Sequence, residues 1–224
     1  MSLIEIIGPV MIGPSSSHTA GAVRLGNIAR RLWDGPIQDV IIYLRGSFAS
    51  TYWGHGTDKA LIGGLLGMQP DDLRIREAFS IAKKSGMNYI FKEEVVDGAH
   101  PNSVRFIIKS EKNIMEIVGA STGGGSIQIQ EIDGFSIEID GELPTLIIFH
   151  KDKLGVVASI TSELFRINQN IAKMKLKRKS RGEEAIMVIE IDTQNNQQDI
   201  LDHLNVAKNL YSKILFLPTE RNHR

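Results

Sequence analysis

The sequence has no cysteine, no excess of charge of either sign and no hydrophobic run long enough to span a bilayer. Without cysteine the chain cannot form a disulfide, use a thiolate nucleophile or bind metal through sulfur. Its 26 basic residues balance 26 acidic ones, so bulk attraction to nucleic acid or to a membrane surface is not expected. The first residues include Glu5, Gly8 and Pro9 without a basic leader, which is untypical of a signal peptide. We therefore expect a cytoplasmic protein.

The composition is otherwise that of a globular protein long enough for two modest domains. Hydrophobic residues make up 42% of the 224 residues, and charged residues make up 23%. Residues 1–143 carry 13 basic and 17 acidic side chains, whereas residues 144–224 carry 13 and 9. A Gly-Glu-Leu-Pro stretch at residues 141–144 separates the two halves. The sequence therefore predicts one domain over residues 1–143 and a second over residues 144–224.

Hydrophobic periodicity predicts an α+β fold in both halves. In the first half, helices are expected to pack on a mixed, largely antiparallel sheet. Strands are expected at residues 3–7 and 40–44 and in five runs between 89 and 139, and helices at residues 57–66 and 71–84, with an earlier helix that ends near Trp33. In the second half, the order strand, helix, strand, strand, helix, strand is expected at residues 145–149, 155–167, 170–179, 184–191, 197–210 and 213–217. This βαββαβ order is that of a ferredoxin-like sandwich.

Residues 8–21, Gly-Pro-Val-Met-Ile-Gly-Pro-Ser-Ser-Ser-His-Thr-Ala-Gly, place five consecutive polar side chains just before an expected helix. The two Gly-Pro pairs fix a non-helical approach, because proline restricts its own φ and the conformation of the residue before it. Free N–H groups and the positive end of the helix dipole favour an anion at such a helix start. The stretch therefore predicts an anion site that carries its own titratable base, His18. A serine cap beside a surface histidine is the alternative.

Four further polar patches occur at turns in the first half. Gly-His-Gly-Thr-Asp at residues 54–58 is expected between a strand and a helix, with His55 in the loop and Thr57 or Asp58 capping the helix. His-Pro-Asn at residues 100–102 precedes a strand, and Arg-Gly-Ser at residues 45–47 follows one and can hold a carboxylate. Residues 121–126, Ser-Thr-Gly-Gly-Gly-Ser, join two strands and, taken alone, are more typical of a loose hairpin. Together the patches predict one polar site for a small anionic substrate.

Other histidines and a lysine-rich segment lack such neighbours. We expect His150, His203 and His223 to lie on the surface. Lysines alternate with apolar residues over 173–179, which is more typical of an exposed or edge strand than of a nucleic-acid platform. No metal site is predicted in this chain.

The polar patches together resemble the motifs of a known family. Residues 13–19, 54–58, 100–102 and the three glycines at 123–125 are similar to those of the beta chain of bacterial iron–sulfur-dependent L-serine dehydratase. The resemblance covers nearly the whole chain. The C-terminal domain resembles an ACT domain, a ferredoxin-like module that often binds amino acids, through residues 153–157 and 170–172.

The resemblance implies a lyase that converts L-serine to pyruvate and ammonia without pyridoxal phosphate. In that family a [4Fe–4S] cluster has one iron free of cysteine, which binds the carboxylate and hydroxyl of serine and polarises the leaving hydroxyl. Because this chain has no cysteine, the cluster must be held by cysteines of a separate alpha chain. The expected partners are therefore this alpha chain and L-serine, with further oligomerisation and with no nucleic acid or membrane.

The candidate site residues fall into three groups. His18 is the first acid–base candidate, with His55 and Asp58 behind it, and the sequence does not decide whether His18 or His55 is the base. The predicted substrate-binding residues are Ser15, Ser16, Ser17, Thr19, Thr57, His100 and Asn102. In the ACT-like domain, Gly155 lets the backbone approach an effector and Asn170 offers a donor and an acceptor. Dimerisation alone is an equal alternative for that domain.

Two other functions fit parts of the pattern. The first half also resembles the effector-binding domain of some phosphoglycerate dehydrogenases, which favours a non-catalytic amino-acid-sensing subunit. A scaffold that only stabilises the alpha chain is the other. The two histidine motifs favour catalysis, because ligand binding alone does not require them.

Overall fold

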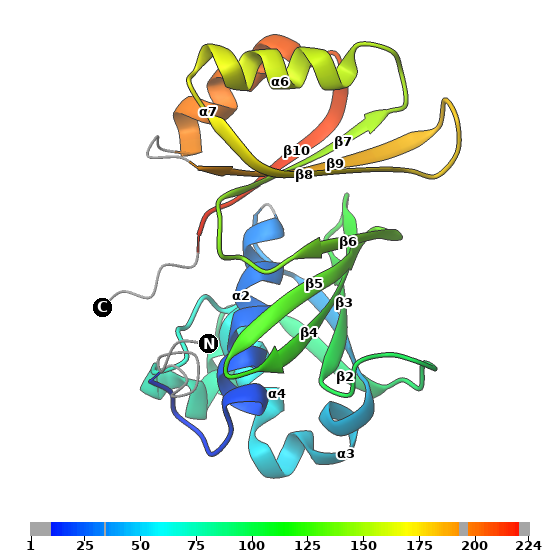
Figure 1. Cartoon of the computed structure of the whole chain (residues 1–224). Coiled ribbons are helices and arrows are strands. Elements are labelled where there is room, and N and C mark those ends of the chain that lie inside the picture. Colours follow the sequence, from blue (N-terminus) through cyan, green and yellow to red (C-terminus); the bar gives the residue numbers. More distant parts are fainter. Residues whose placement is uncertain (1–9, 34, 193–196, 220–224) are drawn as a thin grey trace. The chain divides into compact units, whose positions relative to one another are not determined.

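The computed structural model describes residues 10–33, 35–192 and 197–219, and the chain divides after Gly134 into two compact units (Figure 1). The elements of the first unit are, in chain order, η1 (Ser16–Gly21), α2 (Ala22–Leu32), β1 (Asp39–Leu44), α3 (Gly46–His55), α4 (Thr57–Leu65), η2 (Leu73–Glu77), α5 (Ala78–Lys84), β2 (Asn88–Glu93), β3 (Ser103–Lys109), β4 (Ile114–Gly123) and β5 (Ser126–Ile132).

The first unit is a mixed sheet with helices packed against it. Its strands lie in the order β2-β1-β3-β4-β5, with β1 parallel to β2 and the remaining pairs antiparallel. Val40, Ile42 and Leu44 alternate with more exposed residues along β1, so one face of the strand enters the core. The helix α2 packs against β4 and β5 (Figure 1). Residues that precede α2 are thereby fixed next to the sheet.

Two glycines let α2 and α4 approach backbone to backbone. A Cβ atom added to Gly64 would lie 2.2 Å from the carbonyl oxygen of Val23 and 2.8 Å from the Cα atom of Gly26. No side chain fits at this distance, so the contact requires glycine. The contact also positions the polar patches, because α2 follows η1 directly and α4 starts just after His55.

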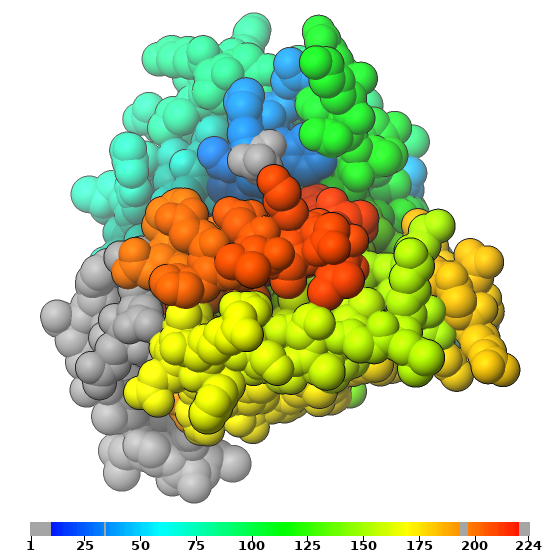
Figure 2. Space-filling view, turned by 90° about the horizontal axis from the view of Figure 1, so that it is seen from above, coloured from blue at the N-terminus to red at the C-terminus, as the bar shows by residue number. Residues whose placement is uncertain are grey.

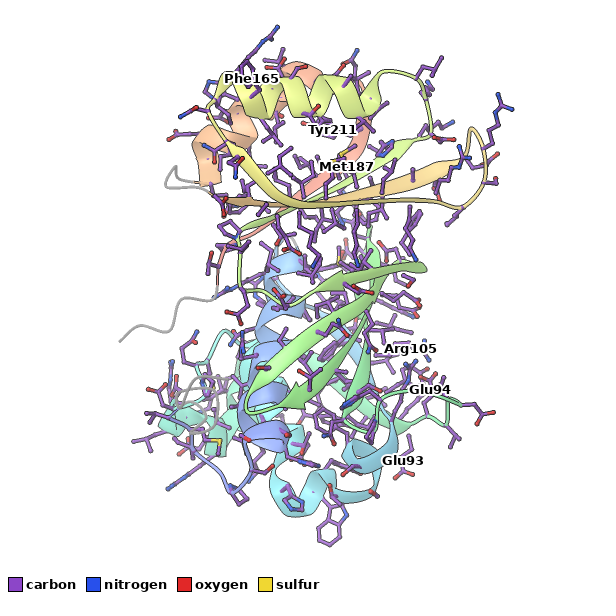
Figure 3. All side chains as sticks on the ribbon, viewed as in Figure 1. Glu93, Glu94, Arg105, Phe165, Met187 and Tyr211 are labelled. Carbon is purple, nitrogen blue, oxygen red and sulfur yellow. The ribbon has the colours of Figure 1, made fainter. Side chains whose placement is uncertain are left out.

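The second unit is a ferredoxin-like sandwich. The unit begins with β6 (Phe135–Ile139), which is not a strand of the sandwich. The elements of the sandwich are β7 (Thr145–Lys151), α6 (Val156–Arg166), β8 (Asn170–Arg178), β9 (Glu184–Asp192), α7 (Gln197–Leu204), η3 (Asn205–Ala207) and β10 (Tyr211–Leu217). The strands β10-β7-β9-β8 form an antiparallel sheet, and β8 is its edge strand, as predicted. Figure 2 shows α6 and α7 side by side. Met187 is fully buried between the sheet and these helices (Figure 3).

The predicted α+β fold is confirmed, including the mixed first sheet and the βαββαβ order of the second half. Several local predictions are wrong. Residues 54–58 join two helices, not a strand and a helix, because the chain turns into α3 directly after β1. Neither Thr57 nor Asp58 caps α4, whose N-cap is Gly56 with no side-chain cap. His150 is only 4% exposed, because it lies on β7 with the buried face of that strand.

Other sequence predictions stay open. The expected strand at residues 3–7 and His223 lie outside the described residues. The domain boundary at residues 143 and 144 remains a prediction about independent folding, and the compact units divide at Gly134. None of the helices in the described ranges has the length and apolar character needed to cross a bilayer.

Candidate functional site

Residues Ser16–Gly21 form the short π-helix η1, which runs straight into α2. Ser15 is in extended conformation and acts as its N-cap, because its Oγ accepts the backbone N–H of His18 at 3.3 Å. Ser16 and Ser17 follow within the π-helix and are partly buried. Such single π-helical turns are uncommon and are frequent at functional sites.

His18 is enclosed by side chains of its own turn and of α3. Its Nδ1 lies 3.3 Å from Ser15 Oγ, and its Nε2 lies 3.2 Å from Ser47 Oγ. The ring of Phe48 meets the imidazole edge-on with centroids 5.3 Å apart, and the ring of His55 lies at 5.0 Å. The structure therefore brings the two candidate bases side by side, with both nitrogens of His18 facing hydroxyls.

The surroundings favour a neutral His18 ring. Burial lowers the pKa of His18 below its ordinary value, and the neighbouring His55 lowers it further by repulsion between two imidazolium charges. At neutral pH the ring is thus free to accept a proton. Burial raises the pKa of the Asp58 carboxyl, whose Oδ1 accepts the backbone N–H of Lys59 at 2.8 Å. No hydrogen bond joins Asp58 to His18 in the described part of the chain, so of the two secondary acid–base candidates it is His55 that contacts the ring.

The His-Pro-Asn patch supports the first turn of α3. The N–H of Phe48 donates to the Pro101 carbonyl at 3.2 Å, and the N–H of Arg45 donates to the Ser103 carbonyl at 3.1 Å. Gly46 has φ of +53°, and a Cβ there would lie 2.7 Å from Pro101. The patch therefore fixes where α3 begins, one residue before Ser47.

The side chains of His100 and Asn102 differ in their hydrogen bonds. His100 Nδ1 accepts the backbone N–H of Asn102 at 3.1 Å, which leaves its Nε2 for another partner. Asn102 Oδ1 is buried without a hydrogen bond, as are Thr19 Oγ1, Thr57 Oγ1 and Ser121 Oγ. Buried hydroxyl and amide oxygens normally find partners, so these four atoms are unusual.

The glycine-rich hairpin joins the same group of segments. The N–H of Ser121 donates to the Asn102 carbonyl at 2.9 Å, and Arg24 Nη1 donates to the Gly125 carbonyl at 2.8 Å. The π-helix η1 itself contacts β4 and β5, the two strands of this hairpin. Five sequence patches, separated by up to about a hundred residues, thus meet around η1 and the start of α3.

Proteins of similar sequence decide the family. Serine dehydratase beta chain sequences match residues 2–132. The chain is 44% identical to a probable L-serine dehydratase beta chain of Bacillus subtilis, over 93% of this chain and 94% of that protein. It is 40% identical to the L-serine dehydratase beta chain of Peptoniphilus asaccharolyticus, over 85% and 87% of the two chains. The chain belongs to the serine dehydratase beta chain family. The resemblance inferred from the polar patches is therefore confirmed.

Beta-chain sequences are also related to part of a larger enzyme. The D-3-phosphoglycerate dehydrogenase of Bacillus subtilis is 26% identical over 88% of this chain, which corresponds to 38% of that protein. A sequence similar to the beta chain thus occurs as one portion of an enzyme with a different named activity.

This beta chain offers no ligand set for an iron–sulfur cluster. It has no cysteine, and the described residues contain no group of three or more His, Asp and Glu side chains able to hold a metal ion. Thiolates are the usual ligands of such clusters. The residues of this chain therefore do not fit an iron–sulfur cluster.

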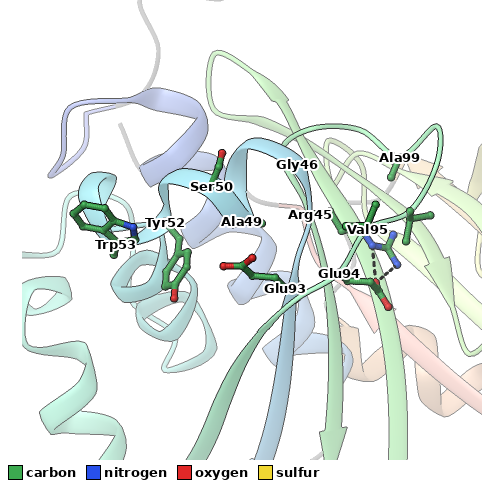
Figure 4. Close-up of a pocket in the computed structure, with 11 residues that line it drawn as sticks. Arg45, Gly46, Ala49, Ser50, Tyr52, Trp53, Glu93, Glu94, Val95 and Ala99 are labelled. Atoms are coloured by element: carbon green, nitrogen blue, oxygen red, sulfur yellow. Dashed lines mark hydrogen bonds and ion pairs between the residues drawn. The ribbon is translucent and has the colours of Figure 1, made fainter.

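A separate pocket of about 440 Å³ is lined by Arg45, by residues of α3 and by the segment 93–99 (Figure 4). Arg45 Nε donates to Glu94 Oε2 at 2.8 Å, so the carboxylate that Arg45 holds belongs to this chain. Trp53 is 76% exposed at the pocket. Neither His18 nor Ser15 lines it.

The two predicted effector-binding residues of the second unit, Gly155 and Asn170, have separate local contacts. Gly155 is the N-cap of α6 with φ of +86°, which fits a turn. The Asn170 amide donates to Asp192 Oδ2 at 2.8 Å, across the β8–β9 pair. The structure thus gives both residues local roles.

Sequence reasoning in this beta chain missed the partners Ser47 and Phe48. Arg-Gly-Ser follows β1 and its arginine binds a carboxylate, as predicted, but it also opens α3, which brings Ser47 and Phe48 to His18. The available signal was the helical spacing of Phe48, Thr51 and Tyr52 after Gly46, which no β-strand pattern explains.

Proposed function

We propose that this chain is the beta chain of an L-serine dehydratase, which deaminates L-serine to pyruvate and ammonia without pyridoxal phosphate. The observation that carries the proposal is His18 held between two serine hydroxyls and against His55, in a chain from the beta-chain family. The named activity of the Bacillus and Peptoniphilus relatives supports the same reaction.

In this proposal His18 is the base that takes the α-proton of serine. Its lowered pKa keeps the ring neutral at neutral pH, which a base requires. Ser16 and Ser17 lie in the same turn and are free of the capping role of Ser15, so they hold the substrate carboxylate. His55 tunes His18, and Asp58 stays a further acid–base candidate. His100 and Asn102 support the loop that holds α3, and the buried hydroxyls of Thr19 and Thr57 stay proposed substrate contacts.

The iron–sulfur cluster is proposed on a separate alpha chain. Its cysteines would hold a [4Fe–4S] cluster that supplies Lewis-acid chemistry for the leaving hydroxyl. The name "beta chain" of the relatives implies such a partner, and the lack of cysteine here requires it. The complete site would then be shared between two chains, with His18 contributed by this one.

For the second domain we propose an ACT-type regulatory role over residues 144–224. Gly155 and Asn170 are the proposed effector contacts, with serine as ligand. The βαββαβ order supports the fold, and the local hydrogen bond of Asn170 to Asp192 makes association alone the alternative.

A non-catalytic sensing subunit is the second candidate function. Most of this chain is similar to a portion of D-3-phosphoglycerate dehydrogenase, which favours the sensing function because the named reaction of that enzyme is not the dehydration of serine. Such a subunit would bind serine near His18 and contribute nothing to turnover.

An anaerobic reconstitution distinguishes these functions. The purified chain alone should be colourless and form no pyruvate from L-serine. Addition of a cysteine-bearing alpha chain with an intact cluster should give pyruvate and ammonia. Broad visible absorption in the purified chain would contradict the assignment of the cluster to the partner, and an alpha chain fully active alone would favour the sensing subunit.

A further inference from the structure

Ser47 faces the ring nitrogen of His18 that Ser15 does not reach. Its Oγ lies 3.2 Å from Nε2, and it comes from a segment 29 residues further along the chain. Ser15 Oγ lies 3.3 Å from Nδ1 and belongs to the same turn as His18. The imidazole is thus bracketed by one local hydroxyl and one distant hydroxyl.

The two hydroxyls differ in their other bonds. Ser15 Oγ already accepts the backbone N–H of His18, and its second lone pair can accept a ring N–H. Ser47 Oγ has no hydrogen-bond partner other than His18 within residues 10–33, 35–192 and 197–219. Ser15 Oγ can thus accept Nδ1–H, and the Ser47 hydroxyl can donate its proton to Nε2.

The backbone around Ser47 is held on both sides. The N–H of Arg45 donates to the carbonyl of Ser103, the first residue of β3, and the N–H of Phe48 donates to the carbonyl of Pro101 in the loop before that strand. The Thr51 hydroxyl donates to the Ser47 carbonyl at 2.8 Å. These bonds fix the first turn of α3, so the hydroxyl of Ser47 is presented to His18 by a rigid segment.

We propose that Ser47 is a positioning residue that donates to Nε2 of His18 and thereby keeps the ring proton on Nδ1. Which nitrogen of a histidine carries the proton is set by the hydrogen bond made at the other. With the proton on Nδ1, Nε2 is the basic nitrogen, and the Ser47 hydroxyl turns its proton away from the ring when Nε2 takes the substrate proton. The link to catalysis rests on the proposed function, whereas the tautomer itself does not.

The tautomer can be read directly from ¹⁵N–¹H correlation spectra of the full chain, with the His18 signals assigned by their loss in His18→Gln. The wild-type spectrum should show the proton on Nδ1. Ser47→Ala should move a large part of the population to Nε2–H, and Ser47→Thr, which keeps a hydroxyl, should restore the wild-type pattern. Ser50→Ala is the matched control, because Ser50 lies in α3 and its hydroxyl donates to the Ser47 carbonyl.

A wild-type ring protonated at Nε2, or an unchanged spectrum in Ser47→Ala, would overturn the proposal. Alanine is the best helix former, so Ser47→Ala should fold normally, and circular dichroism checks this. In the reconstituted enzyme, Ser47→Ala should lower kcat on the order of tenfold, a part of the effect of a well-placed base, with little change in KM. Wild-type kcat in Ser47→Ala would also count against it. If the wild-type complex is inactive, the proposed function fails, and the spectra still decide the role of Ser47.

Discussion

The candidate sites of the two units are built in opposite ways. Around His18, side chains from η1 and α3 face one another, and the loops before β3 and between β4 and β5 hold those elements in place. In the second unit, Gly155 makes a turn and the Asn170 amide is occupied by Asp192 on the adjacent strand. Both regions contain glycine turns beside polar residues. The comparison shows that convergence of distant segments, and not the turn sequence, distinguishes a functional site.

The largest expected effect is on the packing that holds the first site together. Gly64→Ala should lower the free energy of unfolding of the first unit by about 2 kcal/mol, because overpacking against the α2 backbone outweighs the helix propensity of alanine. Trp33 and Trp53, the two tryptophans of the chain, both lie in this unit, so denaturant unfolding followed by tryptophan fluorescence reports it selectively.

Gly54→Ala is the control for this experiment. No atom lies within 4 Å of a Cβ added there, so stability should be unchanged or slightly raised. Equal stability of Gly64→Ala and the wild type would show that α2 and α4 can separate at no cost, and the account of how the site is positioned would be wrong.

A smaller effect is expected for substrate binding at the π-helix. Ser16→Ala in the reconstituted enzyme should raise KM for serine several-fold with kcat nearly unchanged, since a carboxylate contact made equally in ground and transition states affects binding alone. Steady-state kinetics of pyruvate formation measure both constants. A change in kcat with constant KM would instead place Ser16 in the chemical step.

The pH dependence tests the coupling between the two histidines. His55 lowers the pKa of His18, so His55→Gln should raise that pKa and move the acid limb of the kcat/KM profile toward higher pH. Burial still lowers the pKa in the variant, so the shift is partial. His203→Gln, an exposed histidine of the second unit, should leave the profile in place. An unmoved limb in His55→Gln would show that His18 is not the titrating base.

The smallest effect concerns the second unit. Isothermal titration of the full chain with L-serine should show a binding event that persists in His18→Ala and disappears in Asn170→Ala, if the ACT-like domain senses serine. Absence of that event in the wild-type chain would leave the domain an association module. The bond from Asn170 to Asp192 at a solvent-exposed edge strand contributes little, so folding should survive the substitution.

The sequence alone predicts the fold and the five polar patches, but not the contacts between the patches. The alternation in β1 and the βαββαβ order follow from local periodicity, which a single sequence displays. Ser47 could not be paired with His18, because that contact depends on where α3 starts, and the Pro101 loop fixes that start. His150 was misplaced because a lone histidine at a strand end carries no signal of burial.

The central claim is that this chain contributes a catalytic base to a site shared with an alpha chain. The most direct measurement is pyruvate formation by an alpha chain reconstituted with His18→Ala, with association of the two chains measured in parallel. We predict unchanged association and a loss of turnover of about 10²-fold or more, the contribution of a general base. Turnover close to that of the wild-type complex would contradict the claim.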